Sequence, residues 1–255
     1  MASKEVGHTF LARLGKKRLR PGGVTATHWL FQQVDMTPET KVLEVACNMG
    51  TTAIELVKMY GCQVTGVDRD ASVIEKARKN VKHAGLTQQV VLLEANAMHL
   101  PFEDNSFDVV INEAMLTMLQ GKAKEKAIAE YLRVLKPGGK LLTQDVAYEE
   151  MGNSKKLDEL SQTINIHVDP LSIIDWQQLF KQVGFETVKA SFGPMSLMSP
   201  RGMIKDEGFL GAAKIFKNGL KKVNREQFLE MFSFFHEMKN DLCYIAVCST
   251  KGEVE

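Results

Sequence analysis

Two acidic residues stand near the ends of two neighbouring apolar segments. The second acid follows the turn between these segments at a spacing that suits the recognition of a ribose. Glu44 lies in the apolar run 41–46, and the small-residue turn that follows closes on Gly50. A helical stretch and a second apolar run then end in Asp68, 18 residues after that glycine. A ribose-binding carboxylate in a βαβ unit stands about 20 residues beyond the turn. The segment is therefore predicted to bind a nucleotide or nucleoside.

The side chains of this turn bear on which nucleotide binds. A dinucleotide brings a pyrophosphate against the turn, and glycines let the backbone approach it closely. Here Ala46 and Asn48 occupy two of the usual glycine positions, where their side chains would crowd a pyrophosphate. The turn thus favours a nucleoside without phosphate, such as S-adenosylmethionine, over the cofactor of an NAD(P)-dependent oxidoreductase. A non-catalytic nucleoside-binding protein stays open as a third interpretation.

Strand-like and helix-like segments alternate from residue 41 to 145, and this order must position the turn. Continuous apolar strands are expected where helices cover both faces of a parallel sheet. We predict an α/β fold with a Rossmann-like, doubly wound sheet of seven strands, mostly parallel with the last strand antiparallel. The expected strands are 41–46, 63–67, 89–94, 107–112, 139–145, 185–192 and 242–250, and the expected helices are 51–60, 70–84, 115–120, 122–135, 154–164, 172–183 and 225–239.

The order of elements changes after residue 145, which predicts a cap. A terminal strand pair with a helical insertion between its members fits a cap over the site. The expected division is an N-terminal arm and helix at 1–40, covering the cofactor site, and a core at 41–255. The cap insertions are placed around 150–170 and 195–238, although 195–223 shows no clean helical period.

The predicted sheet brings four strand ends together. Ligands of open parallel sheets bind outside the carboxyl ends of the strands. The residues expected to line this crevice are Glu44 to Gly50, Asp68 with Arg69, Asn96 with Ala97 and Met98, and Asn112 with Glu113.

Five motifs, in this order along the chain, resemble those of the class I S-adenosylmethionine-dependent methyltransferases. Within this class, the chain is similar to the small-molecule branch typified by the ubiquinone/menaquinone C-methyltransferases, which is also called methyltransferase type 11. The motifs cover roughly residues 40–145, and they are Val42-Leu43-Glu44-Val45-Ala46-Cys47-Asn48-Met49-Gly50, Gly66-Val67-Asp68, Asn96-Ala97-Met98-His99-Leu100-Pro101-Phe102, Ser106-Phe107-Asp108-Val109-Val110 and Leu132-Arg133-Val134-Leu135-Lys136-Pro137-Gly138-Gly139.

The resemblance implies roles for side chains around the nucleoside. Asp68 would take the ribose hydroxyls, with Arg69 beside it. Asn96 stands where the family usually has Asp, and its side-chain oxygen can still accept a hydrogen bond from the adenine amino group. Ala97 or Met98 would add a backbone contact.

The resemblance also implies partners for the methionine part of the cofactor. The turn at Ala46, Asn48 and Gly50 would pack on the methionine and ribose, and Asn112 would lie near the methionine carboxylate. Glu44 and Glu113 complete the predicted set, although Glu44 could simply cap the helix that follows it.

The N-terminal arm is a second candidate for cofactor contacts. Residues 12–23 are basic and end in a Pro-Gly-Gly turn, after which Thr25 or Thr27 could cap a helix running to about Val34. In many members of the family this region closes over the cofactor, so Arg20 or Thr25 could reach its carboxylate. A solvated arm followed by a helix cap is the alternative.

The implied reaction is methyl transfer to a small-molecule acceptor by in-line displacement, driven mainly by positioning. S-adenosyl-L-homocysteine would be the product. No catalytic residue is assigned. Because an oxygen or nitrogen acceptor can require a general base, His167, Tyr148 and Glu113 are weak candidates for that role. The sequence does not distinguish carbon, nitrogen, oxygen and sulfur acceptors.

The segment 195–238 is rich in methionine and phenylalanine. Such side chains form an adaptable apolar wall for a flat or apolar substrate, or simply the packing between cap helices. Its basic residues could steer an anionic substrate or form a solvated helix face, and they are Lys214, Lys217, Lys221, Lys222 and Arg225.

The bulk composition narrows the functional class. A formal net charge of +1 gives no general attraction to nucleic acid, so no nucleic-acid partner is expected. The four cysteines form no CxxC pair, and no metal is expected. The N-terminus lacks a secretory apolar segment and no run spans a bilayer, so a cytoplasmic protein is expected. A homodimer is left open.

Overall fold

The computed structural model describes residues 4–149 and 155–253, and its centre is a single mixed sheet. The strand order is β3-β2-β1-β4-β5-β8-β7, and the short strand β6 pairs with β5 off this path. β8 runs antiparallel to β5 and β7, whereas the other pairings are parallel. The strands are β1 (Lys41–Val45), β2 (Gln63–Asp68), β3 (Val90–Glu94), β4 (Phe107–Glu113), β5 (Leu135–Tyr148), β6 (Leu171–Ser172), β7 (Thr187–Pro194) and β8 (Leu242–Thr250).

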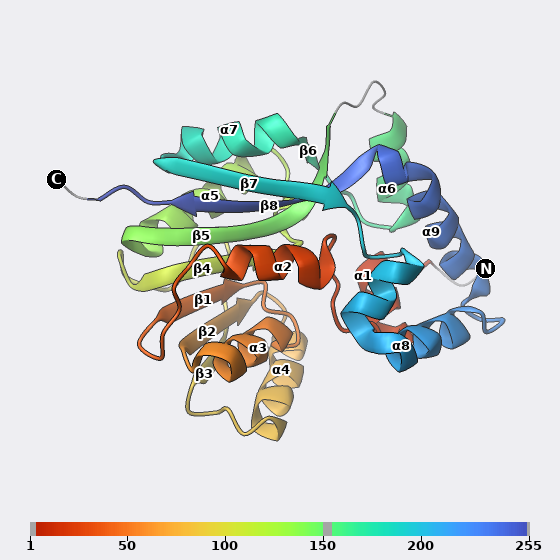
Figure 1. The fold of residues 1–255 in the computed structure, drawn as a ribbon, viewed down its shortest axis with the longest axis horizontal. Coiled ribbons are helices and arrows are strands. Elements are labelled where there is room, and N and C mark those ends of the chain that lie inside the picture. The colour runs from red at the N-terminus through yellow and green to blue at the C-terminus, as the bar shows by residue number, and fades with distance from the viewer. Residues whose placement is uncertain (1–3, 150–154, 254–255) are drawn as a thin grey trace.

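Helices cover both faces of this sheet, as Figure 1 shows. Leu30, Leu56 and Ile74 pack on one face, whereas Ile128 and Trp176 pack on the other. The first face is covered by α2 (Gly23–Phe31), α3 (Thr51–Tyr60) and α4 (Ala71–His83), and the second by α5 (Lys122–Val134) and α7 (Ile173–Val183). The predicted doubly wound sheet with an antiparallel last strand is therefore confirmed, and the two-residue β6 is an addition to it.

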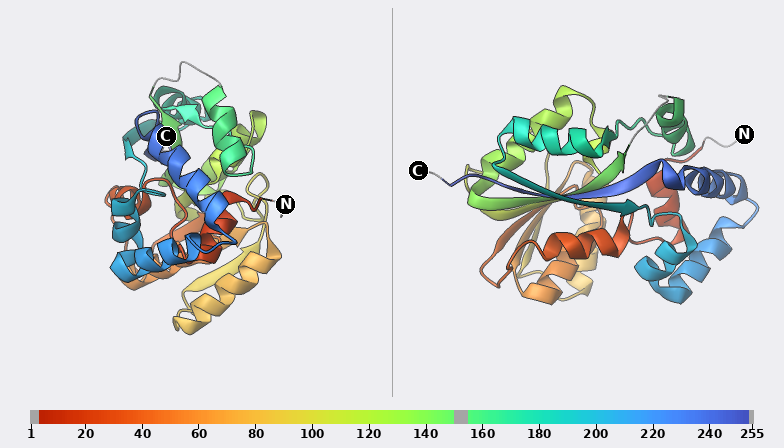
Figure 2. Two further views of the ribbon diagram at one scale, coloured as in Figure 1. Left: turned by 90° about the vertical axis from the view of Figure 1, so that its right-hand side faces the viewer. Right: turned by 45° about the horizontal axis from the view of Figure 1, so that its top comes forward.

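A cap of four helices lies beyond the carboxyl ends of the parallel strands (Figures 1 and 2). Phe10 and Leu14 share an apolar cluster with Met203, Ile215 and Phe228, which joins the N-terminal segment to the chain between β7 and β8. The cap helices are α1 (Gly7–Leu14), α6 (Lys155–Thr163), α8 (Pro200–Gly219) and α9 (Arg225–Glu237), and two short 3-10 turns are η1 (Leu116–Met118) and η2 (Met238–Asn240).

Several local predictions differ from the structure. β5 begins at Leu135 rather than at 139, because the register against β4 shifts between Phe107 and Val109 and the Pro137–Gly139 turn forms an irregularity within the strand. Helix α2 begins after Gly22, so neither predicted threonine cap forms. Only the short turn η1 forms within the helix predicted at 115–120.

Two cap helices were not predicted. Helix α1 lies largely before the basic arm, and α8 occupies most of the segment without a clean period. The predicted insertion at 150–170 includes residues 150–154, which lie outside the described residues, as do residues 1–3 and 254–255 of the predicted domains. In the described part of the chain, no helix has both the length and the apolar character required to cross a bilayer.

Candidate functional site

The turn after β1 follows the backbone path of a glycine series although two of its residues carry side chains. Ala46, Asn48 and Gly50 have φ angles of +58°, +46° and +72°, all in the left-handed region that favours glycine. Two hydrogen bonds hold the turn, from Cys47 N to Val67 O at 3.0 Å and from Gly50 N to Cys47 O at 2.8 Å. The turn is therefore a preformed cradle with side chains at two of its three left-handed positions.

Asp68 is held over this turn at the end of β2. One carboxylate oxygen accepts from Asn48 N and the other from Asp70 N, each at 3.1 Å. The side chain is half-buried, whereas Arg69 is exposed. A carboxylate oxygen can accept two hydrogen bonds, so this fixed carboxylate can also receive two neighbouring hydroxyls of a ligand.

The loop after β3 lies next to Asp68. Ala95 N donates to Asp68 O at 3.0 Å, which places the following residues at the same end of the sheet. The Asn96 side-chain oxygen accepts from Met98 N at 3.0 Å and so closes the loop, with Ala97 at its centre. The structure therefore brings the predicted ribose and adenine residues together.

Asn112 is completely buried where β4 runs beside β1. Its amide nitrogen donates to Val45 O at 3.1 Å. Its amide oxygen is buried and receives no hydrogen bond from the described residues. Leaving a buried acceptor unpaired costs about 1–3 kcal/mol, so the oxygen suits a donor supplied by a ligand, such as an ammonium group.

Glu44 does cap the helix that follows, the alternative weighed for it above. Its carboxylate accepts from Ala53 N at 3.0 Å in the first turn of α3. The side chain is buried, and this burial, together with the negative charge of Glu113, raises the pKa of Glu44 to about 8. Glu44 therefore carries a proton in the folded protein at neutral pH.

This pKa makes stability depend on pH in a defined direction. The pKa of Glu44 rises from 4.5 to about 8 on folding, so between these values the folded protein binds a proton that the unfolded chain releases. Stability contributed by this site is present below pH 4.5 and is lost as the pH rises toward 8. The wild type should thus lose stability through Glu44 between pH 5 and pH 8.5, and Glu44→Gln should not. The free energy of unfolding of Glu44→Gln, measured relative to the wild type, should be about 2 kcal/mol or more higher at pH 8.5 than at pH 5, because one pKa unit is worth about 1.4 kcal/mol.

Urea unfolding followed by circular dichroism at the two pH values measures this difference. Glu125→Gln, which removes an exposed carboxylate from α5, is the matched control and should leave the pH dependence unchanged. Equal pH dependence in Glu44→Gln and the wild type would contradict the assignment.

Arg20 and Glu113 form the centre of a buried polar network. The Arg20 guanidinium pairs with Glu113, donates to Thr52 Oγ1 at 3.2 Å and lies 3.4 Å from a carboxylate oxygen of Glu55. Arg20 is only 4% exposed, and its Nε is buried without a hydrogen-bond partner among the described residues. A ligand carboxylate could accept from this nitrogen.

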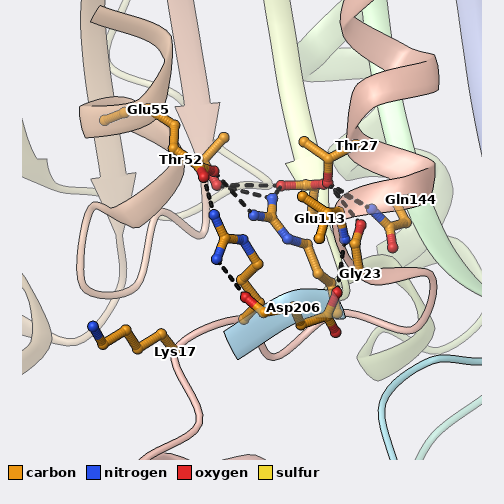
Figure 3. A network of polar contacts seen from close by, with 12 residues as sticks. Lys17, Gly23, Thr27, Thr52, Glu55, Glu113, Gln144 and Asp206 are labelled. Atoms are coloured by element: carbon orange, nitrogen blue, oxygen red, sulfur yellow. Dashed lines mark hydrogen bonds and ion pairs between the residues drawn. The ribbon is translucent and has the colours of Figure 1, made fainter. Parts of the chain in front are cut away.

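The other side of Glu113 is held by the sheet and by α2, as Figure 3 shows. Thr27 Oγ1 donates to Glu113 at 2.6 Å, and Gln144 Nε2 donates to the same oxygen at 2.8 Å. Gln144 is the direct neighbour of Glu113 in the pairing of β4 with β5. The sequence analysis did not name Thr27 or Gln144 as a partner of Glu113. The one signal for Gln144 was its place near the end of the predicted strand 139–145, which pairs with β4.

A second buried network fastens the arm to the cap. Lys16 is fully buried and lies 3.3 Å from Asp206 and 3.7 Å from Glu207 of α8. Asp206 also accepts from Val24 N at 2.9 Å, next to Gly23, where any side chain would collide with this carboxylate. The arm is therefore clamped between the sheet and α8.

An apolar pocket lies behind the arm. It encloses about 670 Å³, including its open mouth, and almost all of its surface is apolar. Its wall combines residues at the carboxyl ends of β4 and β5 with residues of the cap, among them His8, Leu11, Ala114, Asp145, Ile164, Met231 and Phe235. The predicted cap thus does form an apolar wall.

The two titratable side chains of this pocket are Asp145 and His8, and neither was predicted from the sequence. Asp145 accepts from Thr117 N at 3.0 Å and Val146 N at 2.9 Å, and also from the Thr117 hydroxyl. Burial raises its pKa, an effect that these hydrogen bonds oppose. Asp145 therefore fixes the loop after β4, which forms part of the pocket wall.

His8 lies on the opposite wall, in α1. Burial lowers the pKa of His8 below its ordinary value of 6.5, Asp68 opposes this shift, and Arg69 adds to it. The imidazole is consequently neutral at pH 7 and able to accept a proton.

The remaining predicted residues lie apart from this pocket. His167 is exposed, and Tyr148 is half-buried at the end of β5, where burial raises its pKa. Neither lines the pocket, whereas Glu113 stands in the Arg20 network. Thr25 lies on the exposed side of α2, so Thr27 holds the position facing Glu113.

Comparison with known proteins matches a family model described as "Methyltransferase domain" to residues 42–139. An uncharacterized protein of Haemophilus influenzae is 53% identical over 98% of this chain and 100% of its own length. Demethylmenaquinone methyltransferase of Lactiplantibacillus plantarum is 37% identical over 46% of this chain and 51% of its own length. The crystal structure of a putative sarcosine dimethylglycine methyltransferase from Galdieria sulphuraria superimposes with a TM-score of 0.77 at 17% identity, covering 97% of this chain and 98% of that one.

Proposed function

Because the chain belongs to the class I S-adenosylmethionine-dependent methyltransferases, we propose that it methylates a small apolar acceptor bound in the pocket between His8 and Asp145. The single observation that carries this proposal is the position of that pocket. It is apolar, it is roofed by the cap, and it lies at the carboxyl ends of β4 and β5. Ligands of open α/β sheets bind at these strand ends.

The residues present fit the cofactor at both of its ends. Asp68 would receive the ribose hydroxyls, and the loop Asn96–Met98 would lie against the adenine. Two of the buried polar atoms without hydrogen-bond partners in the described residues, Asn112 Oδ1 and Arg20 Nε, belong to predicted cofactor residues, and they match an amino-acid group with one ammonium and one carboxylate. Ala46 and Asn48 would touch the methionine and ribose.

The bound cofactor supplies a methyl group on a positively charged sulfur, which is already an electrophile. The chain has to hold the acceptor in line with that methyl group and keep water away. The apolar wall of the pocket excludes water, and the clamped arm closes it. His8 is placed to remove a proton from an acceptor hydroxyl. A small apolar phenol, enol or quinol is therefore the acceptor class that fits best.

Two variants separate the cofactor site from the acceptor pocket. Asp68→Asn should raise the Kd of S-adenosylmethionine about tenfold, because one charged hydrogen bond is worth roughly 1.5–3 kcal/mol. Ile166→Trp fills the pocket from a half-buried position, so it should abolish methylation while the cofactor Kd stays unchanged. Titration calorimetry gives the Kd, and transfer of a labelled methyl group to phenols, quinols, thiols and amines gives the activity.

Three results would contradict the proposal. Tight binding of NAD without binding of S-adenosylmethionine would favour the oxidoreductase instead. Full methylation by Ile166→Trp would place the acceptor outside this pocket. Binding of the cofactor without methylation of any acceptor class would favour a non-catalytic nucleoside-binding protein.

A further inference from the structure

The outer surface of α8 and the loop after it exposes a concentration of large apolar side chains. Ten large apolar residues of the described chain are exposed, and five of them fall within residues 204–223. Phe209, Leu210 and Val223 are 73%, 82% and 87% exposed, and Ile204 and Leu220 accompany them. Single exposed apolar residues are ordinary, but five within 20 residues are a candidate interaction surface. We refer to these five residues as the α8 patch.

A break in the helix lies within the α8 patch. Gly208 has a φ of +74° and a ψ of 168°, so α8 consists of two helical segments joined at this glycine. Nothing lies within 4 Å of the position that a Cβ of Gly208 would take, which shows that the corner faces solvent. Phe209 and Leu210 begin the second segment and project from the corner. Figure 2 shows α8 along the outside of the cap.

The exposed charges within α8 and the loop after it are all of one sign. Every exposed charged side chain from residue 200 to 225 is basic, and these are Arg201, Lys205, Lys214, Lys217, Lys221, Lys222 and Arg225. The two acids of the segment, Asp206 and Glu207, turn inward and pair with the buried Lys16. This positive surface contrasts with the net charge of +1 of the whole chain.

We propose that the α8 patch docks this protein on an anionic phospholipid membrane surface. Exposed phenylalanine and leucine side chains can enter the interfacial region of a bilayer, and nearby lysines and arginines are attracted to anionic headgroups. Phe209 and Leu210, at the exposed break in the helix, are the side chains placed to enter such a surface. The inward faces of α8 remain packed on α1, so docking requires no rearrangement of the cap.

Vesicle flotation of the full-length protein tests the proposal. Vesicles of phosphatidylglycerol and phosphatidylethanolamine should bind the protein at least about tenfold more strongly than phosphatidylcholine vesicles, and salt should weaken the binding because it screens the lysines. Phe209→Ser/Leu210→Ser should lower this binding about tenfold or more. Lys214→Glu/Lys217→Glu should remove the preference for anionic lipid.

Ile174→Ser is the matched control, because Ile174 is 64% exposed on α7, away from the cap. It should bind vesicles like the wild type, and all variants should keep the wild-type thermal unfolding midpoint, since the altered side chains are exposed. Failure of the wild type to bind anionic vesicles would overturn the proposal, as would unchanged binding by Phe209→Ser/Leu210→Ser. Self-association that these substitutions abolish, without vesicle binding, would assign the α8 patch to a second copy instead.

Discussion

His8→Gln is expected to lower kcat for a hydroxyl acceptor by about 10²-fold or more, the usual contribution of a general base. The neutral imidazole lines the apolar pocket, and burial keeps its pKa below 6.5, so it can accept a proton at neutral pH. Glutamine retains a polar side chain of similar length but cannot act as a base. The wild-type rate should therefore fall as the imidazole becomes protonated at acidic pH, whereas the residual rate of His8→Gln should lack this dependence.

Steady-state kinetics across the pH range, with the acceptor found by the methyl-transfer screen, measures this effect. The Kd of S-adenosylmethionine should stay within about threefold of the wild type, since His8 is expected to act on the acceptor. His167→Gln changes an exposed histidine outside the pocket and is the matched control. A full rate for His8→Gln, or a pH profile that His167→Gln alone alters, would contradict the role of His8.

Arg20→Met is expected to destabilise the fold by about 3–5 kcal/mol, because it leaves one partner of a buried ion pair without its counterion. Glu113 would keep its hydrogen bonds from Thr27 and Gln144 but would lose its cation. Its side chain is only 9% exposed, so water cannot replace the guanidinium.

Urea unfolding at neutral pH measures this loss, and a double-mutant cycle assigns it. Arg20→Met/Glu113→Gln should recover a large part of the stability, because glutamine removes the uncompensated charge and keeps an acceptor for Thr27. Glu75→Gln removes an exposed pair with Arg78 and should cost only about 0–1 kcal/mol. A similarly small loss for Arg20→Met would show that the network contributes little to stability.

The regular core was predictable because its signals are local. β8 matches the predicted range 242–250, since a continuous apolar run fits a strand covered on both faces. Asp68 and the turn at 46–50 were found from type and spacing, and the structure joins them through Asn48 N. The left-handed backbone at Ala46 was not visible, because a side chain there hides the glycine pattern.

The cap could not be predicted in the same way. Gly208 divides α8 into two segments whose buried faces point in different directions, so no single helical period describes the sequence. Helix α1 is stabilised by Phe10 and Leu14, whose partners lie nearly two hundred residues later. His8 and Asp145 become a pocket only through that packing, and the sequence places them 137 residues apart.

The position of β8 has a consequence for biosynthesis. β8 lies between β5 and β7, and β7 pairs with no other strand of the described sheet. During translation β1 to β5 can assemble as they appear, but β7 must wait as an unpaired edge until the cap and β8 have been made. Ribosomal pausing within residues 195–241 would prolong the interval in which β7 has no strand partner.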